Sequence, residues 1–577
     1  MLSTSIKLRK LRSLMSDHSI DAYLIPHSDE FQNEFLPLYN RRLEWMSNFS
    51  GSAGDIIVTL KKAFLFVDGR YTIQASKEVD KNYTIVNYKD ALPHQIIKKQ
   101  KTSNIGYDGN IINYRRLKYL NKNLKNHNLI NIKDNLVDQI WINRPKKKRT
   151  KPFFLNKEQT GQDAKSKVQK VLFYLTKMKS DRYLITATDS ICWLLNIRAS
   201  DIQYSPLFLS RAIIENNGQV HIFSDFNSKQ RIIDRQRINF HPTHHIQNYI
   251  KSCSKNNKFL VDRNTIPSNF VGLIKTTSKI QLIDDVIQNF KSIKNKSEIK
   301  GLRDCHIRDG AALTKSIYWL KKNIDKKKIT ELDASNLIDR NRKKGKYFHS
   351  LSFPTISGTG PNAAIVHYRV TKKTNRLIRK SDILLIDSGA QYLDGTTDIT
   401  RSIAFASQNK ERKEMYTRVL KGHIAVATCN LKYGEKGKRI DNLARKFLKE
   451  INTDYEHGTG HGVGHFLNVH EGPQSISKYS KNRFENGMLT SNEPGYYKKG
   501  QFGIRIENLI LSKIKNNILS FETVSFAPLE KNLIENALLN KAEIYWINNY
   551  HKEVRKKLYS FMNEAEKKWL LKETDPL

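Results

Sequence analysis

Four histidines and four glycines fall within one stretch, HGTGHGVGHFLNVH, at residues 457–470. His457, His461 and His465 are four residues apart, as on one face of a helix, but each interspersed glycine would cost a helix about 1 kcal/mol. An extended chain instead directs these histidines to one side and the glycines to the other, where a second backbone can approach closely. No G-x-x-x-x-G-K-[ST] pattern is present, which disfavours a phosphate-binding loop. The stretch therefore predicts a wall of histidines beside a reactive site.

Two pairs of carboxylates could complete that site. The first is Asp387 and Asp398, in IDSGAQYLDGTTDIT. Apolar residues precede Asp387, so its strand is expected to be buried, and a buried aspartate must be paired or bound to a cation. The Asp394–Gly395 dipeptide indicates a hairpin that places the two aspartates on the same face but offset along the strands. A bulge or wider loop must bring them together, and the sequence does not fix that register.

Glu493 and Glu507 form the second pair, in NEPGYYKKGQFGIRIEN. A hairpin centred on Gly500 places them directly opposite, within side-chain reach. Either pair alone could be surface carboxylates or salt-bridge partners. Beside His461, however, four carboxylates suit hard or borderline divalent cations. Two cations balance that charge better than one, and such a pair activates water and polarises a carbonyl for hydrolysis.

The segments that must position these residues follow residue 285. Long helical patterns cover 294–324 and 411–431. Residues 1–285 contain no comparable cluster of ionisable groups beside glycines, so we expect the chemistry in the second half of the chain. The strand-like runs there are 382–392, 397–405 and 502–512.

The first half of the chain contains an internal repeat. Residues 7–26 and 167–186 each read as an amphipathic helix that leads into an apolar strand. A tryptophan segment follows each, around Trp45 and Trp193, and then a further strand. We predict two related α/β domains joined by the basic run RPKKKRTK (144–151), read as a solvated linker; chance similarity of generic helix–strand units is the alternative. The expected domains are residues 1–144, 145–288 and 289–577.

The net charge of +43 in 577 residues is compatible with nucleic-acid binding. The lysines are dispersed along the chain, however, and no nucleic-acid-binding motif accompanies the one dense run at 144–151. We therefore expect no specific nucleic-acid partner. No run of eighteen apolar residues is present, so we expect no transmembrane helix and no membrane partner.

The N-terminus and the cysteines bear on the compartment. The first 25 residues lack a continuous apolar core, which argues against a secretory signal, and their apolar spacing predicts a helix, with a basic transit peptide as the alternative. The four cysteines are scattered, without a C-x-x-C pair, which fits a reducing compartment. We expect a cytoplasmic protein.

Together these motifs resemble the pita-bread metallopeptidases, which include methionine aminopeptidase, prolidase, aminopeptidase P and creatinase. The phrases GTGPNAAIVHY, DSGAQYLDGTTDITR, HGTGHGVGHFLNVHEGP and NEPGYY are similar to those of the Xaa-Pro aminopeptidases (aminopeptidase P) in their three-domain form. LEWMSNFSGSAG, DGRYTIQA, LVDQIWINRP and WINNYHKEVRKKL extend the likeness over nearly the whole chain. The resemblance implies an α/β (α+β) fold: two creatinase-like α/β domains followed by a C-terminal pita-bread domain.

The resemblance also implies roles for individual residues. His367 matches a histidine near the substrate, and His457 and His470 match histidines around the scissile peptide and the proline pocket. Arg505 matches an arginine that orients ligand carboxylates, and Arg70, in DGRYTIQA, is expected to contact substrate. The implied metal ligands are Asp387, Asp398, His461, Glu493 and Glu507.

One histidine of the opening stretch is left over. His465 has no counterpart in the family, where a small residue is usual. In an extended chain it would lie about 13 Å from His461, too far for both to ligate one ion. We expect a packing or hydrogen-bonding role for His465.

The implied reaction is hydrolysis of the bond between an N-terminal residue and a following proline by a metal-bound hydroxide. Glu493 would move a proton from the attacking water toward the leaving amine, His470 would stabilise the oxyanion, and His367 is a further catalytic candidate. The resemblance implies two Mn²⁺ ions, although the residue types also allow Co²⁺ or Zn²⁺. It likewise implies peptide substrates with proline second, and a homodimer. The alternatives are a prolidase acting on Xaa-Pro dipeptides and a non-catalytic peptide-binding relative.

Overall fold

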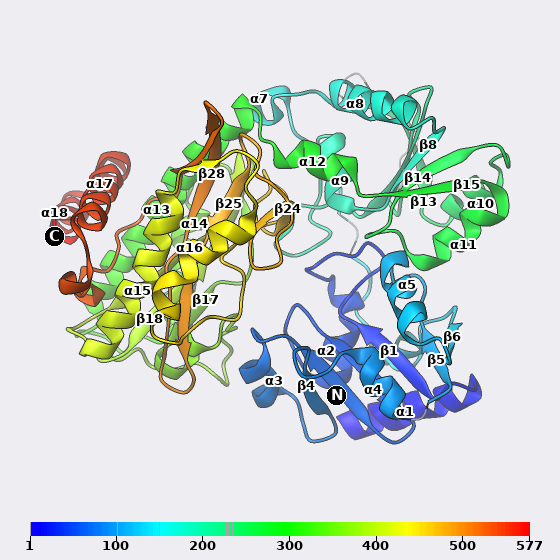
Figure 1. The fold of residues 1–577 in the computed structure, drawn as a ribbon, viewed down its shortest axis with the longest axis horizontal. Coiled ribbons are helices and arrows are strands. Elements are labelled where there is room, and N and C mark those ends of the chain that lie inside the picture. The colour runs from blue at the N-terminus through cyan, green and yellow to red at the C-terminus, as the bar shows by residue number, and fades with distance from the viewer. Residues whose placement is uncertain (1, 101, 149, 227–229, 234–235) are drawn as a thin grey trace. The chain divides into compact units, whose positions relative to one another are not determined.

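The computed structural model describes residues 2–100, 102–148, 150–226, 230–233 and 236–577. The chain divides into two compact units, which we describe separately (Figure 1). The N-terminal unit contains residues 1–156 and 162–287, and the C-terminal unit contains residues 157–161 and 288–577. Within the described ranges, no helix is both long and apolar enough to cross a membrane.

The N-terminal unit contains two sheets with matching topology. In the order β4-β3-β2-β1-β5-β6, strand β1 (Ala22–Pro26) is antiparallel to β2 and parallel to β5. In the order β12-β13-β11-β10-β8-β14-β15, strand β8 (Arg182–Ile185) is antiparallel to β10 and parallel to β14. The other pairings match too: β2–β3 and β10–β11 are antiparallel, β3–β4 and β11–β13 are parallel, and β5–β6 and β14–β15 are parallel. Among the residues described, the edge strand β12 has no equivalent in the first sheet. Further bounds are β2 Asp55–Thr59, β3 Ala63–Val67, β4 Thr84–Asn87, β5 Asn104–Tyr107, β6 Asn128–Asn131, β10 Ser210–Glu215, β11 Val220–Ser224, β12 Gln230–Ile233, β13 Gln236–Pro242, β14 Lys258–Asp262 and β15 Lys279–Ile283.

A buried lysine is repeated along with the topology. Lys7, on α1 (Thr4–Asp17), donates to the carbonyl of Trp45 and lies 4.9 Å from the centre of its ring. Lys167, on α8 (Ala164–Lys177), donates to the carbonyl of Trp193 at 2.9 Å and lies 4.2 Å from that ring. An ammonium over an indole face is attracted by the ring quadrupole, which offsets part of its desolvation. The predicted internal repeat is confirmed in topology and in side-chain contacts.

The basic run 144–151 is only partly a solvated linker. Residues 146–148 are exposed. Arg144, however, donates to the carbonyl of Tyr39 at 2.8 Å and forms a 2.7 Å ion pair with Asp138. The prediction was therefore wrong for Arg144, because a guanidinium can be paired while its stem packs on the protein. Position 149 lies outside the described residues.

Helices α13 to α16 run alongside the strands of the C-terminal unit in Figure 1. The helix predicted at 294–324 is α13 (Lys296–Asn323), which begins with a capping box of Asn295 and Glu298. The helix predicted at 411–431 is α15 (Lys410–Ala427), which packs on α16 (Gly437–Lys449). Further helices of this unit are α7 (Lys157–Thr160), α14 (Glu331–Lys343), α17 (Lys541–Leu558) and α18 (Glu564–Glu573), and α12 (Val286–Ser292) lies at its boundary.

The strands of this unit form two main sheets and two short ones. The main sheets have the orders β17-β18-β21 and β22-β29-β28-β25-β23-β24, and the short ones are β16-β19-β20 and β26-β27. The bounds are β16 Phe348–Leu351, β17 Ile356–Thr359, β18 Ile383–Ser388, β19 Ala390–Tyr392, β20 Gly395–Thr396, β21 Ile399–Ala404, β22 Leu431–Lys432, β23 Gly460–Gly462, β24 Glu471–Ile476, β25 Leu489–Asn492, β26 Gly495–Lys498, β27 Phe502–Arg505, β28 Asn508–Lys515 and β29 Ile518–Thr523. The mixed α/β class is confirmed.

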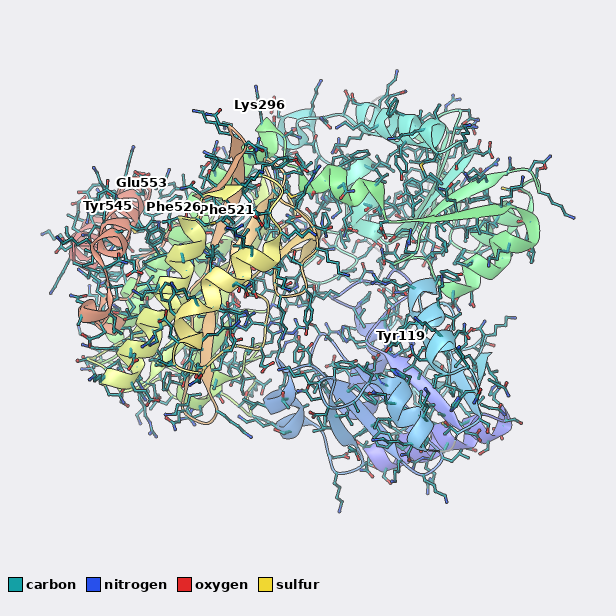
Figure 2. All side chains as sticks on the ribbon, in the orientation of Figure 1. Tyr119, Lys296, Phe521, Phe526, Tyr545 and Glu553 are labelled. Atoms are coloured by element: carbon teal, nitrogen blue, oxygen red, sulfur yellow. The ribbon has the colours of Figure 1, made fainter. Side chains whose placement is uncertain are left out.

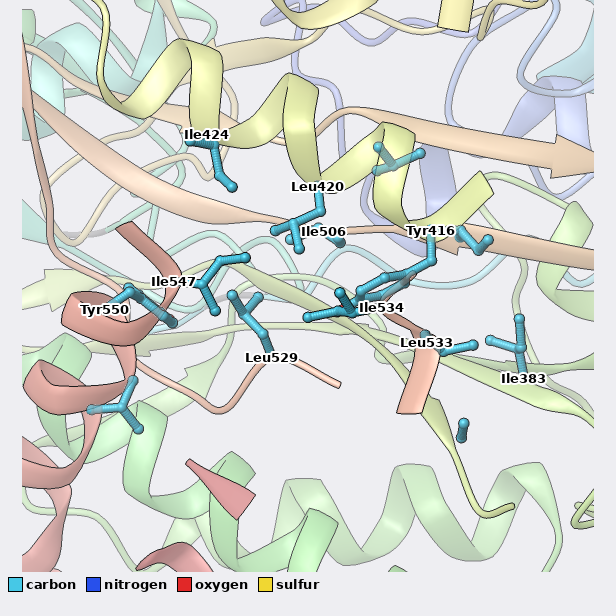
Figure 3. Packing of buried hydrophobic residues seen from close by; sticks show 14 of the residues in the cluster. Ile383, Tyr416, Leu420, Ile424, Ile506, Leu529, Leu533, Ile534, Ile547 and Tyr550 are labelled. Atoms are coloured by element: carbon cyan, nitrogen blue, oxygen red, sulfur yellow. The ribbon is translucent and has the colours of Figure 1, made fainter. Parts of the chain in front are cut away.

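An apolar core joins α15 to α17, the penultimate α-helix of the chain (Figure 3). Tyr416 and Leu420 come from α15, and Ile547 and Tyr550 come from α17. Ile506, which directly precedes a predicted metal ligand, is completely buried in the same cluster. Packing of α17 therefore reaches the backbone that carries the site.

Candidate metal centre

Both predicted hairpins exist and carry the carboxylates. In the first, β18 pairs with β21 so that Asp387 lies opposite Thr400. The turn is at Leu393–Asp394 rather than Asp394–Gly395, because Tyr392 pairs with Gly395. This one-residue shift of a two-residue turn, rather than the expected bulge or wider loop, brings Asp398 two residues, rather than four, from the position facing Asp387.

The second hairpin has the predicted register in both of its strand pairs, β26 with β27 next to the turn and β25 with β28 farther from it. Pairs such as Gly495 with Arg505 and Asn492 with Asn508 place Glu493 opposite Glu507. The ladder is interrupted at these two glutamates. The N–H of Glu493 donates to Thr459 O at 2.8 Å, and the N–H of Glu507 donates to Thr400 O at 3.2 Å. The carboxylates therefore lie where the hairpin leaves one sheet and enters the next.

The histidine stretch is extended only over Gly460–Gly462. Beyond it the chain bends, and Phe466 adopts a left-handed conformation with φ of 49°. The extended reading through His465 was therefore wrong. The glycine face is confirmed: a Cβ on Gly460 would lie 1.9 Å from Ser491 O, and one on Gly462 would lie 2.1 Å from Glu471 O.

His461 is oriented toward the carboxylates. Its Nε2 lies 3.5 Å from Asp398 Oδ2 and 3.4 Å from Glu493 Oε1. Its Nδ1 lies 2.9 Å from Gly462 O, and a carbonyl can only accept, so the proton belongs on Nδ1. The Nε2 lone pair therefore faces the acidic cluster. One ligand atom from each of Asp398, His461 and Glu507 lies within 4.8 Å of the others.

Three carboxylate oxygens in this cluster are buried without a hydrogen-bond donor among the described residues: Asp387 Oδ1, Asp398 Oδ1 and Glu507 Oε1. Their sister oxygens on Asp387 and Glu507 accept from Arg505 (2.6 Å) and Thr400 (2.7 Å). An orphaned buried carboxylate oxygen is costly unless a cation or proton meets it. The donor set, several carboxylates and one imidazole nitrogen, fits divalent cations.

The electrostatics of the cluster show the same need for positive charge. Burial, then the charges of Asp387 and Glu493, raise the pKa of Asp398 well above its usual value. Burial and the neighbouring charges of Asp398 and Glu493 likewise raise the pKa of Glu507. Burial also raises the pKa of Glu493, against the opposing influence of His461. Both burial and mutual repulsion therefore disfavour the charged forms of these carboxylates unless positive charge lies among them.

Arg505 lies where a residue that orients a ligand carboxylate would be placed. It is 1% exposed and donates to Asp387 through Nη2. Its Nη1 donates to the hydroxyl of Tyr497 at 2.6 Å, and that hydroxyl lies 2.8 Å from His457 Nε2. Sequence reasoning missed Tyr497. Two-residue periodicity along the predicted hairpin could have found it, since Glu493, Tyr497 and Arg505 then share one face.

The other predicted residues have different surroundings. The ring of His470 lies 4.2 Å from the ring of His461, nearly perpendicular to it. His367 directly follows Val366, whose carbonyl lies 3.3 Å from Arg505 Nη1. His465 is buried, at the bend beyond β23.

Arg70 lies in the N-terminal unit. Its guanidinium makes two hydrogen bonds, of 2.9 and 2.7 Å, to the carboxylate of Asp68. Its substrate contact remains a prediction.

A buried ion triad follows His470. Glu471 lies 2.9 Å from Lys291 Nζ and 2.6 Å from Lys294 Nζ, and all three side chains are at most 1% exposed. Breaking a buried pair leaves an uncompensated charge, typically at a cost of about 3–5 kcal/mol. The triad therefore fixes the main chain next to His470. Sequence reasoning missed it, because the lysines lie far from Glu471 in the chain.

Family models match nearly the whole chain. Residues 300–513 match the model of metallopeptidase family M24, and residues 7–140 and 143–298 each match a creatinase/prolidase N-terminal domain. Residues 517–577 match the C-terminal region of peptidase M24.

Relatives match over the full chain. A probable Xaa-Pro aminopeptidase P of Coprinopsis cinerea is 37% identical, over 100% of this chain and 99% of its own length. One from Laccaria bicolor is 36% identical, over 100% and 94%. The crystal structure of an X-prolyl aminopeptidase from Caenorhabditis elegans, described as a cytosolic enzyme with a di-nuclear active site, matches with a TM-score of 0.94 and 31% identity over 100% of both chains. The chain therefore belongs to metallopeptidase family M24, among the three-domain Xaa-Pro aminopeptidases.

Proposed function

We propose that this chain removes the N-terminal residue from peptides whose second residue is proline, with two divalent cations in the carboxylate cluster. The single observation that carries the proposal is the set of orphaned carboxylate oxygens on Asp387, Asp398 and Glu507, in the cluster that His461 Nε2 approaches. Asp387, Asp398, His461, Glu493 and Glu507 would hold the cations. The names of the full-length relatives supply the specificity for Xaa-Pro bonds.

When bound, the cations would lower the pKa of water and polarise the scissile carbonyl. We propose Mn²⁺, from the family resemblance and the carboxylate-rich donor set; Co²⁺ and Zn²⁺ are compatible with the same residues. Metal analysis of protein purified without added metal, together with reconstitution by each ion, tests this choice.

Glu493 is the proposed proton carrier. Its Oε1 accepts from Ser491 Oγ at 3.0 Å and lies 3.4 Å from His461 Nε2, inside the cluster. Burial raises its pKa, which favours transfer of a proton to it from the attacking water. It then gives that proton to the proline nitrogen, which has no hydrogen of its own in the peptide.

Histidines would bind the remainder of the scissile peptide. His470, packed against His461, would donate to the carbonyl oxygen as it becomes an oxyanion. His457, held by Tyr497, would contact the proline side, and His367 and Arg70 are further substrate contacts. The Tyr497–Arg505 link couples His457 to Asp387, so substrate contact and metal ligation share one hydrogen-bonded chain.

Prolidase activity is the second candidate. The discriminating experiment compares Mn²⁺-loaded protein on a tripeptide Xaa-Pro-Yaa and on the dipeptide Xaa-Pro. We expect a clear preference for the tripeptide. Preference for the dipeptide would favour a prolidase, and inactivity on both by fully metal-loaded protein would favour a non-catalytic relative.

Three further proposals accompany the activity. The domains are residues 1–144, 145–288 and 289–577, close to the ranges of the family models. A cytoplasmic location is supported by the description of the C. elegans relative and by the scattered cysteines. A homodimer is carried over from the family resemblance, and light scattering of the purified protein tests it.

A further inference from the structure

A buried arginine lies directly behind the carboxylate cluster. Arg401, on β21, is 1% exposed. Its six hydrogen bonds within the described residues all go to neutral acceptors: four main-chain carbonyls, the amide of Asn508 and the hydroxyl of Tyr550. A buried guanidinium needs all of its donors satisfied, so these acceptors are tightly constrained.

The Nη1 group of Arg401 holds the main chain of the proposed ligand Glu507 in place. Arg401 Nη1 donates to Glu507 O at 2.7 Å and to Thr400 O at 2.8 Å. Thr400 O also accepts from the N–H of Glu507, and the hydroxyl of Thr400 donates to Glu507 Oε2. Glu507 is thus held at its N–H, its carbonyl and one carboxylate oxygen. The direction of the orphaned Oε1 follows from these three restraints.

The other side of Arg401 is bound by the end of the chain. Nε donates to Pro528 O at 3.1 Å, and Nη2 donates to Ala527 O at 2.9 Å and to Tyr550 Oη at 2.7 Å. These acceptors belong to the region 517–577, which matches the C-terminal model of the family. The ring of Tyr550 is stacked on Trp546 with 5.4 Å between ring centres.

We propose that Tyr550 is a positioning residue for the metal ligand Glu507, acting through Arg401. The C-terminal region is then part of the metal centre and not only an appended domain. This inference rests on the proposed ligand role of Glu507. Loss of the Tyr550 hydroxyl would remove one of the shortest bonds of Arg401 and let the guanidinium, and with it the Glu507 backbone, shift.

Tyr550→Phe isolates the hydroxyl. The ring would keep its stacking on Trp546, and because the change only removes an oxygen atom it introduces no clash. The ring also borders a cavity of about 300 Å³ lined by Phe526, Trp546 and Glu553. Figure 2 marks Phe526 and Glu553 of this lining. Tyr416 offers a matched control in the same core (Figure 3): it is completely buried, and its hydroxyl accepts from the N–H of Glu530.

The test titrates metal-free wild type, Tyr550→Phe and Tyr416→Phe with Mn²⁺ by calorimetry, and records the thermal midpoint of each metal-free protein. Partners of metal ligands typically change metal affinity by about 10–100-fold. We expect affinity for one Mn²⁺ to fall on the order of tenfold in Tyr550→Phe, with kcat recovering at excess Mn²⁺. Tyr416→Phe should bind like wild type, even if its midpoint falls equally. Equal Mn²⁺ affinities in the two variants would overturn the proposal.

Glu507→Ala in the same titration separates this inference from the proposed site. If that variant still binds two Mn²⁺ ions, the site assignment fails. If it loses an ion while Tyr550→Phe binds like wild type, only the role of Tyr550 fails. Arg401→Lys provides a second route should Tyr550→Phe not fold: about 10–100-fold weaker Mn²⁺ binding supports the proposal, and unchanged binding contradicts it.

Discussion

The carboxylate cluster of the C-terminal unit differs from the buried aspartates of the N-terminal unit in its hydrogen bonding. In the N-terminal unit, each buried aspartate of the described residues has a hydrogen bond or ion pair to both oxygens. Among the described residues of the C-terminal unit, Asp309 and Asp441 are partnered at both oxygens too, whereas Asp387, Asp398 and Glu507 each retain an oxygen without a donor. The fully partnered aspartates are Asp29, Asp55, Asp108, Asp262 and Asp285.

This difference distinguishes buried carboxylates whose hydrogen bonds stabilise the fold from buried carboxylates that have an oxygen available to a ligand. A buried polar group left unsatisfied costs about 1–3 kcal/mol. Three such oxygens within one cluster therefore lower the stability of the metal-free protein, and bound cations would remove this penalty. Burial alone does not mark the site, because Asp285 is 6% exposed and Asp387 is 8% exposed. The missing donors mark it.

The largest expected effect comes from removing an orphaned carboxylate. Asp398→Ala and Glu507→Ala should abolish peptidase activity and reduce bound metal well below two ions per chain, as measured by mass spectrometry. Asp285→Asn is the matched control from the N-terminal unit. Its carboxylate serves Tyr183, Ser190 and Ile287, so the change should lower stability by about 1–3 kcal/mol and leave the metal content intact. Full activity and full metal content in both alanine variants would contradict the conclusion that the orphaned carboxylates bind the metal.

His470 should have the next largest effect. His470→Ala should lower kcat by about 10²–10³ if the imidazole stabilises the oxyanion, with bound metal unchanged. His461→Ala, by contrast, should eliminate activity and reduce the metal content. Steady-state kinetics with parallel metal analysis separates the two roles. Equal metal loss in both variants would make His470 a ligand.

A pH-dependent effect follows from the raised pKa values of Asp398 and Glu507. A carboxyl whose pKa is higher in the folded than in the unfolded protein contributes stability at low pH, and that contribution is lost as pH rises through the folded pKa. Bound cations should counter this loss. The increase in thermal midpoint caused by Mn²⁺ should therefore grow between about pH 5 and about pH 8. Asp398→Asn should flatten this trend, and a shift independent of pH in wild type would refute it.

The smallest effect is expected at His465. His465→Ser should leave the metal content unchanged and kcat/KM within about tenfold, or about 1.4 kcal/mol. The residue is buried at the bend after β23. Its substitution tests whether a histidine close to His461 in sequence contributes to metal binding. Metal loss comparable to that in His461→Ala would show that it ligates.

Sequence reasoning placed the glutamates better than the aspartates. The hairpin around Gly500 has a symmetric turn, so pairing Glu493 with Glu507 followed from counting. The Asp394–Gly395 signal was one residue away from the actual turn, because the short strand β19 pairs with both β16 and β20 in another sheet. Tertiary pairing of that kind has no local signature.

Residues that act on the site from distant segments could not be found by spacing. Arg401, on β21, is hydrogen-bonded to Tyr550 of α17, and Lys291 forms an ion pair with Glu471. Such contacts depend on how separate elements pack, whereas the ligands themselves lie in short motifs. The topological repeat of the N-terminal unit was predictable because it rests on helix–strand periodicity.

The glycines of the histidine stretch make the site sensitive to atoms that never touch metal or substrate. A single methyl group on Gly460 or Gly462 would collide with a carbonyl oxygen of a neighbouring strand. The backbone would have to move, and His461 lies between them. Gly458 has more room, with its nearest neighbour 3.4 Å from a Cβ. Natural variation should therefore be as restricted at the two inner glycines as at the ligands, and more permissive at the first.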